Sequence, residues 1–152
     1  MKPDAGADAH YRALESLYSA APINTHFKSA LRILDRGRSA IDFEVGTSHY
    51  HAAGAAHGTL YFKMLDDAAF YAANSLVTDA FLLTTAFNLL FTRPIRGGAY
   101  RAEGRWISGE RRVLVAEACI IDAAGVEVAR GTGTFMRSRI ALSSLSGYST
   151  PA

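Results

Sequence analysis

The most strongly apolar part of the chain is a run of about twenty residues that begins at His57-Gly58. Apolar side chains recur around nearly the whole circumference of a helix drawn through it, which is typical of a helix surrounded by other elements. The pattern predicts a buried helix from about Gly58 to Val77. Two adjacent acids, Asp66 and Asp67, interrupt it. A carboxylate in apolar surroundings is costly unless it is paired or used, so this pair is the first candidate for function.

The chain before this helix contains an amphipathic segment and two shorter strand-like segments. Residues 8–20 place apolar side chains three and four positions apart, which predicts a helix that ends before Pro22. Residues 23–34 are predicted to form a strand. Residues 40–45 alternate apolar and acidic side chains, as expected of a strand with one face in water. Residues 46–56 are predicted to form a loop that leads into the central helix.

Beyond the central helix the apolar period changes to that of strands. Four strands are predicted, at residues 81–91, 99–108, 113–122 and 126–137. The links between them are short and rich in turn residues, which requires antiparallel neighbours because parallel strands need a long crossover. The predicted fold class is therefore α+β, a curved antiparallel sheet wrapped around a long central helix. The later strands are apolar on both faces, so we expect another subunit to cover the outer one.

Length and composition narrow the class of protein. A chain of 152 residues can bury one substantial core. The net charge of +2 is too small to indicate nucleic-acid binding. The longest apolar runs fall short of a membrane span, and the N-terminus has no signal-peptide pattern, so a cytoplasmic location is expected. The single cysteine, Cys119, excludes a disulfide within the chain and is interpreted as a small buried side chain.

The two acids of the central helix differ in their predicted surroundings. Asp67 shares a polar stripe with Lys63, four residues earlier, so we interpret it as a partly hydrated residue paired with that lysine. Asp66 is rotated from it by about 100° and has apolar helical neighbours such as Phe62 and Phe70. Desolvation there would raise the pKa of Asp66 and strengthen it as a base. A carboxylate that hydrogen-bonds a loop backbone is the competing interpretation.

Three motifs follow one another in a characteristic order and spacing. They are His57-Gly58 with Asp66 nine residues after the histidine, the strand segment from Thr84 to Pro94, and Gly97-Gly98. Over roughly residues 37–137 this pattern resembles the hotdog-fold thioesterases, specifically the phenylacetate-pathway and 4-hydroxybenzoyl-CoA-like branch. The resemblance implies a hotdog fold, a homodimer or a dimer of dimers (homotetramer), and hydrolysis of acyl-CoA or acyl-carrier thioesters.

The resemblance also implies catalytic roles for four residues. The Gly58 N–H, at the start of the helix, would polarise the thioester carbonyl and hold the developing oxyanion. Asp66 would act as general base or as nucleophile, and Thr84 would orient the attacking water. His51 stands where the family often has an asparagine that touches the carbonyl or the water. By analogy, each site would be shared between two subunits.

Five further residues are candidates for binding substrate. His57 would organise the corner between loop and helix, and Thr59 replaces a glycine of many members, which would narrow the site. Asn88 belongs to the strand motif. Arg93 and Arg137 lie near strand ends and could bind coenzyme A phosphates, although solvated surface charge is the other interpretation of each.

Other chemistries fit the sequence less well. His49, His51 and His57 with Asp66 could be imagined as metal ligands, but their spacing matches no strong motif, so no metal is expected. No cofactor is expected besides coenzyme A as part of the substrate, and no nucleic-acid or membrane partner. Two alternatives stay open. One is a hotdog hydratase or dehydratase that pairs a loop histidine with Asp66, and the other is a non-catalytic acyl-CoA-binding module.

The predicted organisation has three parts. Residues 1–22 form an N-terminal helical extension, residues 23–140 the hotdog domain, and residues 141–152 a flexible tail.

Overall fold

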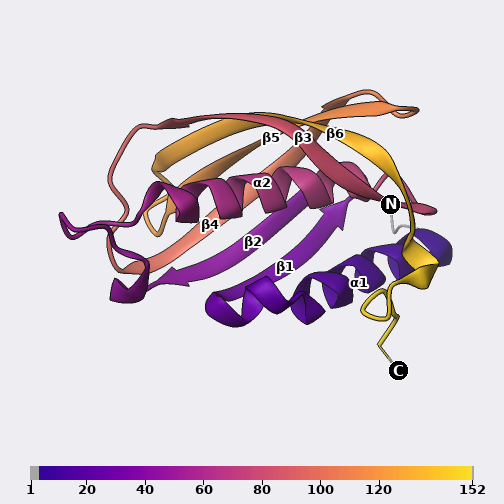
Figure 1. Cartoon of the computed structure of the whole chain (residues 1–152), viewed down its shortest axis with the longest axis horizontal. Coiled ribbons are helices and arrows are strands. Elements are labelled where there is room, and N and C mark those ends of the chain that lie inside the picture. The colour runs from indigo at the N-terminus through magenta and orange to yellow at the C-terminus, as the bar shows by residue number, and fades with distance from the viewer. Residues whose placement is uncertain (1–3, 152) are drawn as a thin grey trace.

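The computed structural model describes residues 4–151 and consists of one curved antiparallel sheet around a central helix (Figure 1). The elements are α1 (Ala5–Ala20), η1 (Pro22–His26), β1 (Lys28–Asp35), β2 (Arg38–Val45), η2 (Thr47–His49), α2 (Gly58–Asn74), β3 (Ala80–Phe91), β4 (Gly98–Ser108), β5 (Val113–Asp122), β6 (Glu127–Ala141) and η3 (Leu142–Ser144). The strand order is β1-β2-β4-β5-β6-β3, so β1 and β3 are the edges of the sheet. The predicted α+β architecture is confirmed.

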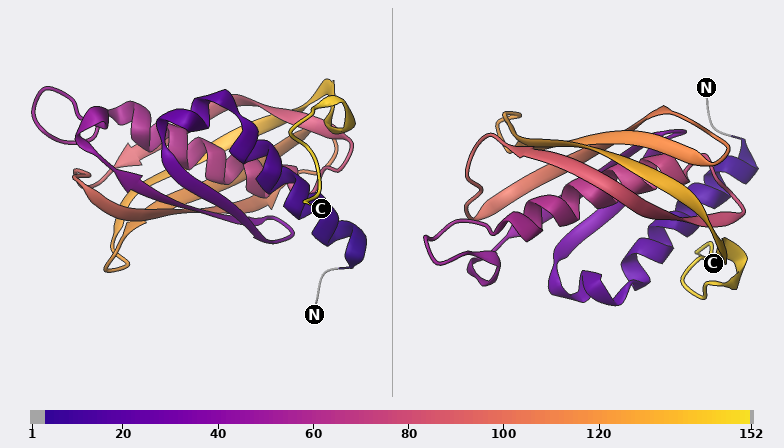
Figure 2. Two further views of the ribbon diagram at one scale, coloured as in Figure 1. Left: turned by 90° about the horizontal axis from the view of Figure 1, so that it is seen from below. Right: turned by 45° about the horizontal axis from the view of Figure 1, so that its top comes forward.

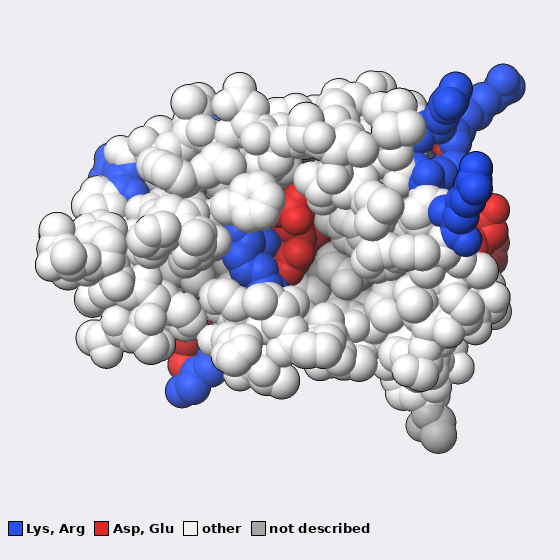
Figure 3. All heavy atoms as spheres, viewed as in Figure 1, with Lys and Arg blue, Asp and Glu red and all other residues white. Residues whose placement is uncertain are grey.

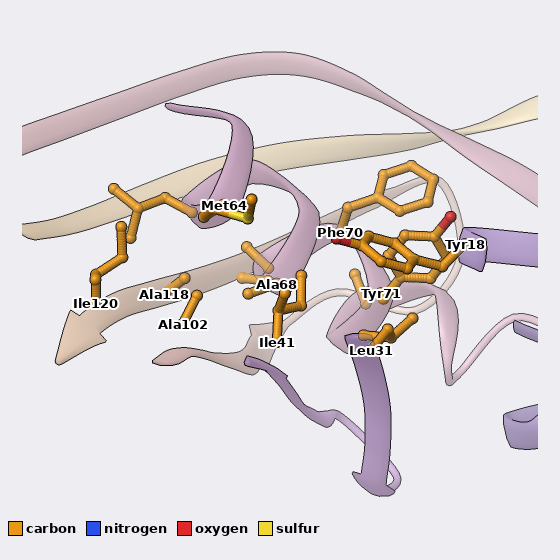
Figure 4. Close-up of a cluster of buried hydrophobic side chains, with 14 of the residues drawn as sticks. Tyr18, Leu31, Ile41, Met64, Ala68, Phe70, Tyr71, Ala102, Ala118 and Ile120 are labelled. Carbon is orange, nitrogen blue, oxygen red and sulfur yellow. The ribbon is translucent and has the colours of Figure 1, made fainter. Parts of the chain in front are cut away.

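Helix α2 buries most of its side chains against the sheet because small and apolar residues let the two approach each other closely. In Figure 4 its Met64 and Ala68 lie among the side chains of the core. Both residues are completely buried. A Cβ at Gly104 of β4 would overlap the Ala68 carbonyl oxygen, so only glycine fits there. Ser39 of β2 donates a hydrogen bond to that same oxygen at 2.6 Å. The helix is thereby fixed against the centre of the sheet.

The strands alternate as their sequence patterns predict. The inward side chains of β5 are almost fully buried and pack on α2: Leu114, Ala116, Ala118 and Ile120. Val113, at the start of the same strand, is 42% exposed. The sheet therefore has one packed concave face and one outer face with apolar residues in water, and the expected cover of that outer face stays a prediction.

The N-terminal extension differs from the prediction at its end. Helix α1 packs against β1 at the side of the sheet (Figure 2). The strand predicted from residue 23 begins only at Lys28, because Pro22 opens the 3-10 turn η1. Proline is favoured at the first position of a helical turn, where its missing N–H is not needed. Ile23 is consequently 55% exposed rather than part of the sheet.

The end of α2 and the start of β3 are fixed by polar contacts that the apolar pattern does not reveal. The helix was predicted to reach Val77 but ends at Asn74. The Asn74 side chain donates to the carbonyls of Val77 and Ala80 and accepts from the Leu82 N–H. One buried amide thus shapes the link between helix and strand.

The C-terminal segment, predicted to be flexible, packs against α1 and the end of the sheet. Strand β6 continues to Ala141, opposite Ala80 of β3, rather than ending at residue 137. Leu142 is completely buried. The Tyr148 hydroxyl lies 2.6 Å from Nδ1 of His10, and Nε2 of that histidine lies 3.0 Å from the Asn74 carbonyl oxygen. A few apolar and aromatic side chains therefore anchor a segment whose overall composition is that of a loop.

Candidate active site

Asp66 lies on the side of α2 that meets strand β3. The Thr84 hydroxyl donates a hydrogen bond to Oδ1 of Asp66 at 2.8 Å. Burial raises the pKa of Asp66 to about 6. The negative charge of Asp67 also raises this pKa, whereas the Thr84 hydrogen bond and the positive charge of Lys63 lower it. A carboxylate with this pKa is mostly ionised at neutral pH and is a stronger base than an ordinary aspartate.

Asp67 points to the opposite flank of α2, where α1 and η1 lie. Lys63 forms an ion pair with it and donates a hydrogen bond to Oδ1 of Asn24 at 2.5 Å. The same ammonium lies 5.0 Å from the ring centroids of both Tyr18 and Phe27. The predicted pairing of Asp67 with Lys63 is confirmed. This carboxylate therefore belongs to the contact between α2 and the N-terminal extension.

The charges of α2 reach the surface of the single chain. Figure 3 shows a small cluster of basic and acidic atoms at the position of α2 in Figure 1, within a wide uncharged surface. The charged residues of α2 are Lys63, Asp66 and Asp67. A molecule bound over this helix would thus meet a small group of acidic and basic atoms within a wide uncharged surface.

A pocket lies at the N-terminus of α2. Its volume is about 340 Å³, and its lining includes His51, Gly58, Phe91 and Arg93. The Gly58 N–H is at the first position of the helix, where a backbone donor has no intrahelical acceptor. A Cβ at Gly58 would lie 3.4 Å from the Phe91 ring, which is ordinary contact distance. The pocket offers a backbone donor and a helix dipole to an anionic oxygen.

Histidine side chains hold the loop that enters this pocket. Nδ1 of His57 accepts a hydrogen bond from the Thr59 N–H at 3.1 Å and so caps the helix. Nδ1 of His51 accepts from the Ala53 N–H at 3.0 Å. In each of these two rings Nδ1 accepts a backbone hydrogen bond, which leaves Nε2 as the remaining polar atom.

Tyr61 fastens the link between β3 and β4 across the start of the helix. Its buried hydroxyl donates to the Arg93 carbonyl and accepts from the Ile95 N–H, each at 2.7 Å. Its ring also packs on Phe91, with centroids 4.5 Å apart. Tyr61 and Phe91 were missed from the sequence. The position of Tyr61 three residues after Gly58 was the only available signal.

Two other candidates lie apart from the pocket and from the Asp66–Thr84 pair. Asn88 is exposed on β3, opposite Thr132 of β6. Arg137, on β6, forms a 2.8 Å ion pair with Asp79, which follows α2. The structure thus brings together the candidates His51, His57, Gly58, Thr59 and Arg93 at one end of α2, and Asp66 with Thr84 further along it.

The loop histidines considered as metal ligands are turned to different partners. Nε2 of His49 lies 3.0 Å from the His26 carbonyl oxygen, and its ring stacks on Phe27. Within residues 4–151, no group of three His, Cys, Asp or Glu side chains is arranged to hold a metal ion. In the same described part of the chain, no helix is both long and apolar enough to cross a membrane.

The distance along α2 separates the oxyanion donor from the carboxylate. Gly58 and Asp66 are eight residues apart, which is about 12 Å at about 1.5 Å per residue. A reacting carbonyl must lie within roughly 3 Å of both its base and its oxyanion donor. A single α2 helix therefore cannot present both groups to one carbonyl.

Comparison with known proteins places this arrangement in a family. The family model described as Thioesterase superfamily matches residues 53–129, half of the chain, including all of α2. A curated Saccharolobus solfataricus protein whose provisional name is esterase is 26% identical over 103 residues, 68% of this chain and 69% of the relative.

Solved structures show the same fold. The E. coli PaaI protein from the phenylacetic acid degradation operon superposes with a TM-score of 0.81 at 18% identity, covering 89% of this chain and 97% of that one. A Streptococcus mutans protein bound to acetyl CoA gives a TM-score of 0.65 at 20% identity, covering 74% and 88%. The predicted hotdog fold is confirmed. The chain belongs to the thioesterase superfamily, and it is a thioesterase.

Proposed function

We propose that this protein hydrolyses acyl thioesters of coenzyme A and uses the Asp66 carboxylate to do so. The observation that carries the proposal is the Asp66–Thr84 pair: a half-buried carboxylate whose pKa is raised to about 6, held by one hydroxyl. The acetyl CoA bound to the Streptococcus mutans neighbour supports coenzyme A as the carrier. Hydrolysis is a redox-neutral displacement by water, so the proposed reaction needs no redox cofactor.

The proposed steps balance without further reactants. Asp66 takes a proton from water while the water oxygen attacks the thioester carbon. The Gly58 N–H and the dipole of α2 stabilise the oxyanion that forms. The C–S bond of the intermediate then breaks, and the leaving thiolate takes the proton held by Asp66 to become the thiol. In the alternative route Asp66 attacks the carbon itself and the C–S bond breaks to release the thiolate. Water then hydrolyses the mixed anhydride to the free acid and Asp66, and the proton set free converts the thiolate to the thiol.

We further propose that each site contains Gly58 of one copy and Asp66 of another. The separation of about 12 Å along α2 supports this, because one chain cannot present both groups to one carbonyl. Strand β3, which carries Thr84, is an edge of the sheet, and an edge strand can pair with a second chain. A homodimer or a dimer of dimers would supply the second copy.

Thiol release from short, medium, long and aryl acyl-CoA thioesters tests the activity. We expect Asp66→Asn to lose at least about 100-fold in rate, as on removing a general base. Unchanged turnover in Asp66→Asn would exclude its role. Hydration of an enoyl thioester with little thiol release would indicate the hydratase alternative, and binding without any turnover the binding module.

Mixing two inactive variants tests the shared site. Gly58→Pro removes the N–H at a helix position that favours proline, and Gly58→Ala is its matched control because it keeps that N–H. We expect Gly58→Pro and Asp66→Asn to be nearly inactive alone. Reassembled together, they should regain activity, because one site of each mixed dimer then holds an intact Gly58 and an intact Asp66. No recovery in a mixture shown to contain mixed dimers would place both groups on one chain.

A further inference from the structure

Helix α2 and strand β3 face each other through four pairs of residues, which we refer to as rungs. The rungs are Gly58–Phe91, Phe62–Phe87, Asp66–Thr84 and Phe70–Phe81. The helical members are four residues apart and therefore share one face of α2. The polar rung thus has an aromatic rung on either side of it.

The two aromatic rungs differ in how far they are buried. Phe70 is 6% exposed and also packs against Tyr71 and Phe135, with ring centroids 5.0 and 5.8 Å away. That rung belongs to the hydrophobic core. Phe62 is 42% exposed and meets Phe87 edge-on, with centroids 5.8 Å apart. Much of this ring is in water, so packing of the core does not account for it.

Phe87 packs closely on the backbone of the neighbouring strand β6. Its ring lies over Gly131 and Gly133 of β6, and a Cβ at either glycine would collide with it. The glycines at positions 131 and 133 therefore make room for an aromatic ring. Because the β6 backbone lies directly behind its ring, Phe87 is blocked from moving towards that strand, and Phe62 packs on it from the α2 side.

We propose that the Phe62–Phe87 rung is the wall against which the acyl group of the substrate packs, and that it limits the length of that group. This rests on the proposed function, with Asp66 acting at the thioester carbon. Phe62 is one helical turn, about 6 Å, from Asp66 on the same face. The acyl group is the apolar end of the thioester, so it gains most from apolar surface. The Phe70–Phe81 rung, on the other side of Asp66, offers no room for the acyl group because Phe70 is packed in the hydrophobic core.

A series of straight-chain acyl-CoA thioesters from two to twelve carbons, assayed by thiol release, tests the wall. The variants are Phe62→Ala, which shortens the wall, and Phe62→Trp, which enlarges it. Both change a partly exposed side chain, so the fold should persist, and thermal unfolding checks this. Ile107→Ala is the matched control, because Ile107 is 44% exposed on β4 and lies outside the rungs.

We expect Phe62→Ala to raise kcat/KM for the longest accepted chains relative to the shortest by at least about tenfold, since one methylene can contribute about that much discrimination. Phe62→Trp should move the profile towards shorter chains, and Ile107→Ala should leave it in place. If the wild type is active and both Phe62 variants keep its chain-length profile, the proposed role of the Phe62–Phe87 rung is wrong and the proposed function is unaffected. A wild-type protein that releases thiol from none of the thioesters overturns both.

Discussion

The two flanks of α2 carry adjacent carboxylates that differ mainly in what lies opposite them. On the β3 flank Asp66 accepts a hydrogen bond from the Thr84 hydroxyl. On the α1 flank Asp67 meets Lys63, which is itself held by Asn24 and two aromatic rings. Burial raises the pKa of both acids, but Lys63 directly opposes this at Asp67. The comparison indicates that the partner matters as much as burial: the cation beside Asp67 directly opposes the rise of its pKa, and the partner of Asp66 is a neutral hydroxyl.

The largest expected effect is on turnover, which should fall far more in Asp66→Asn than in Asp67→Asn. Asp66→Asn should lower kcat by at least about 100-fold because it removes the base. Asp67→Asn should lower kcat by less than about tenfold, because a neutral amide can still accept from Lys63 and a removed general base costs far more than that. Steady-state thiol release by both variants, with thermal unfolding to check the fold, makes the measurement. Equal losses in the two would abolish the distinction between the flanks.

The next effect is on stability and belongs to the α1 flank. Lys63→Met should lower the free energy of unfolding by about 2 kcal/mol, less than a fully buried pair because both side chains keep some contact with water. The loss arises because Asp67 remains partly buried without its cation. Urea unfolding of wild type and variant measures it.

A double variant separates the charge from the packing. Adding Asp67→Asn to Lys63→Met removes the unpaired carboxylate and should restore about half of the loss. If Lys63→Met alone unfolds at the wild-type urea midpoint, the ion pair is a surface contact and the contrast between the flanks is much weaker.

The contrast between the acids was readable from the sequence because a helix fixes angles locally. The rotation of about 100° per residue puts Asp67 with Lys63 and turns Asp66 towards Phe62 and Phe70. The residue pairs that form the rungs between α2 and β3 could not be predicted from the sequence. Which residue of β3 meets which residue of α2 depends on how the strand lies across the helix, and no local period records that. The pairings of Phe87 with Phe62 and of Thr84 with Asp66 needed the structure.

The boundaries show the same limit. The strand pattern predicted β5 well because Leu114 to Ile120 alternate strictly between a buried and an outer face. The helical pattern, by contrast, predicted α2 to continue to Val77, whereas the helix ends at Asn74, whose side-chain amide hydrogen-bonds the link to β3. The composition of the C-terminal segment likewise did not reveal its contacts, which depend on a few side chains such as Leu142 and Tyr148.

A smaller effect follows from the raised pKa of Asp66. Its folded pKa of about 6 exceeds the ordinary value of 3.8, so the folded state binds the proton more tightly. Wild-type stability therefore falls as pH rises from about 4 to about 6, and the cost is complete above that range. Asp66→Asn escapes this cost. Its free energy of unfolding relative to wild type should increase by about 1 to 2 kcal/mol between pH 4 and pH 7.5. A difference that does not change with pH would show that burial leaves the charge of Asp66 well solvated.

The smallest expected effect concerns the one hydroxyl that distinguishes the β3 flank. The Thr84 hydrogen bond to the ionised Asp66 lowers the pKa of that carboxyl against the effect of burial. Thr84→Val keeps the shape of the side chain and removes the donor, so the pKa should rise. The acidic limb of the kcat/KM profile should move upward by about half a unit to one unit, which corresponds to about 0.7 to 1.4 kcal/mol, the net contribution of one ordinary hydrogen bond. Thr84→Ser keeps the hydroxyl and should leave the limb in place. If valine and serine give the same limb, the hydroxyl holds strand and helix together without tuning the base, and the reactivity of Asp66 comes from desolvation alone.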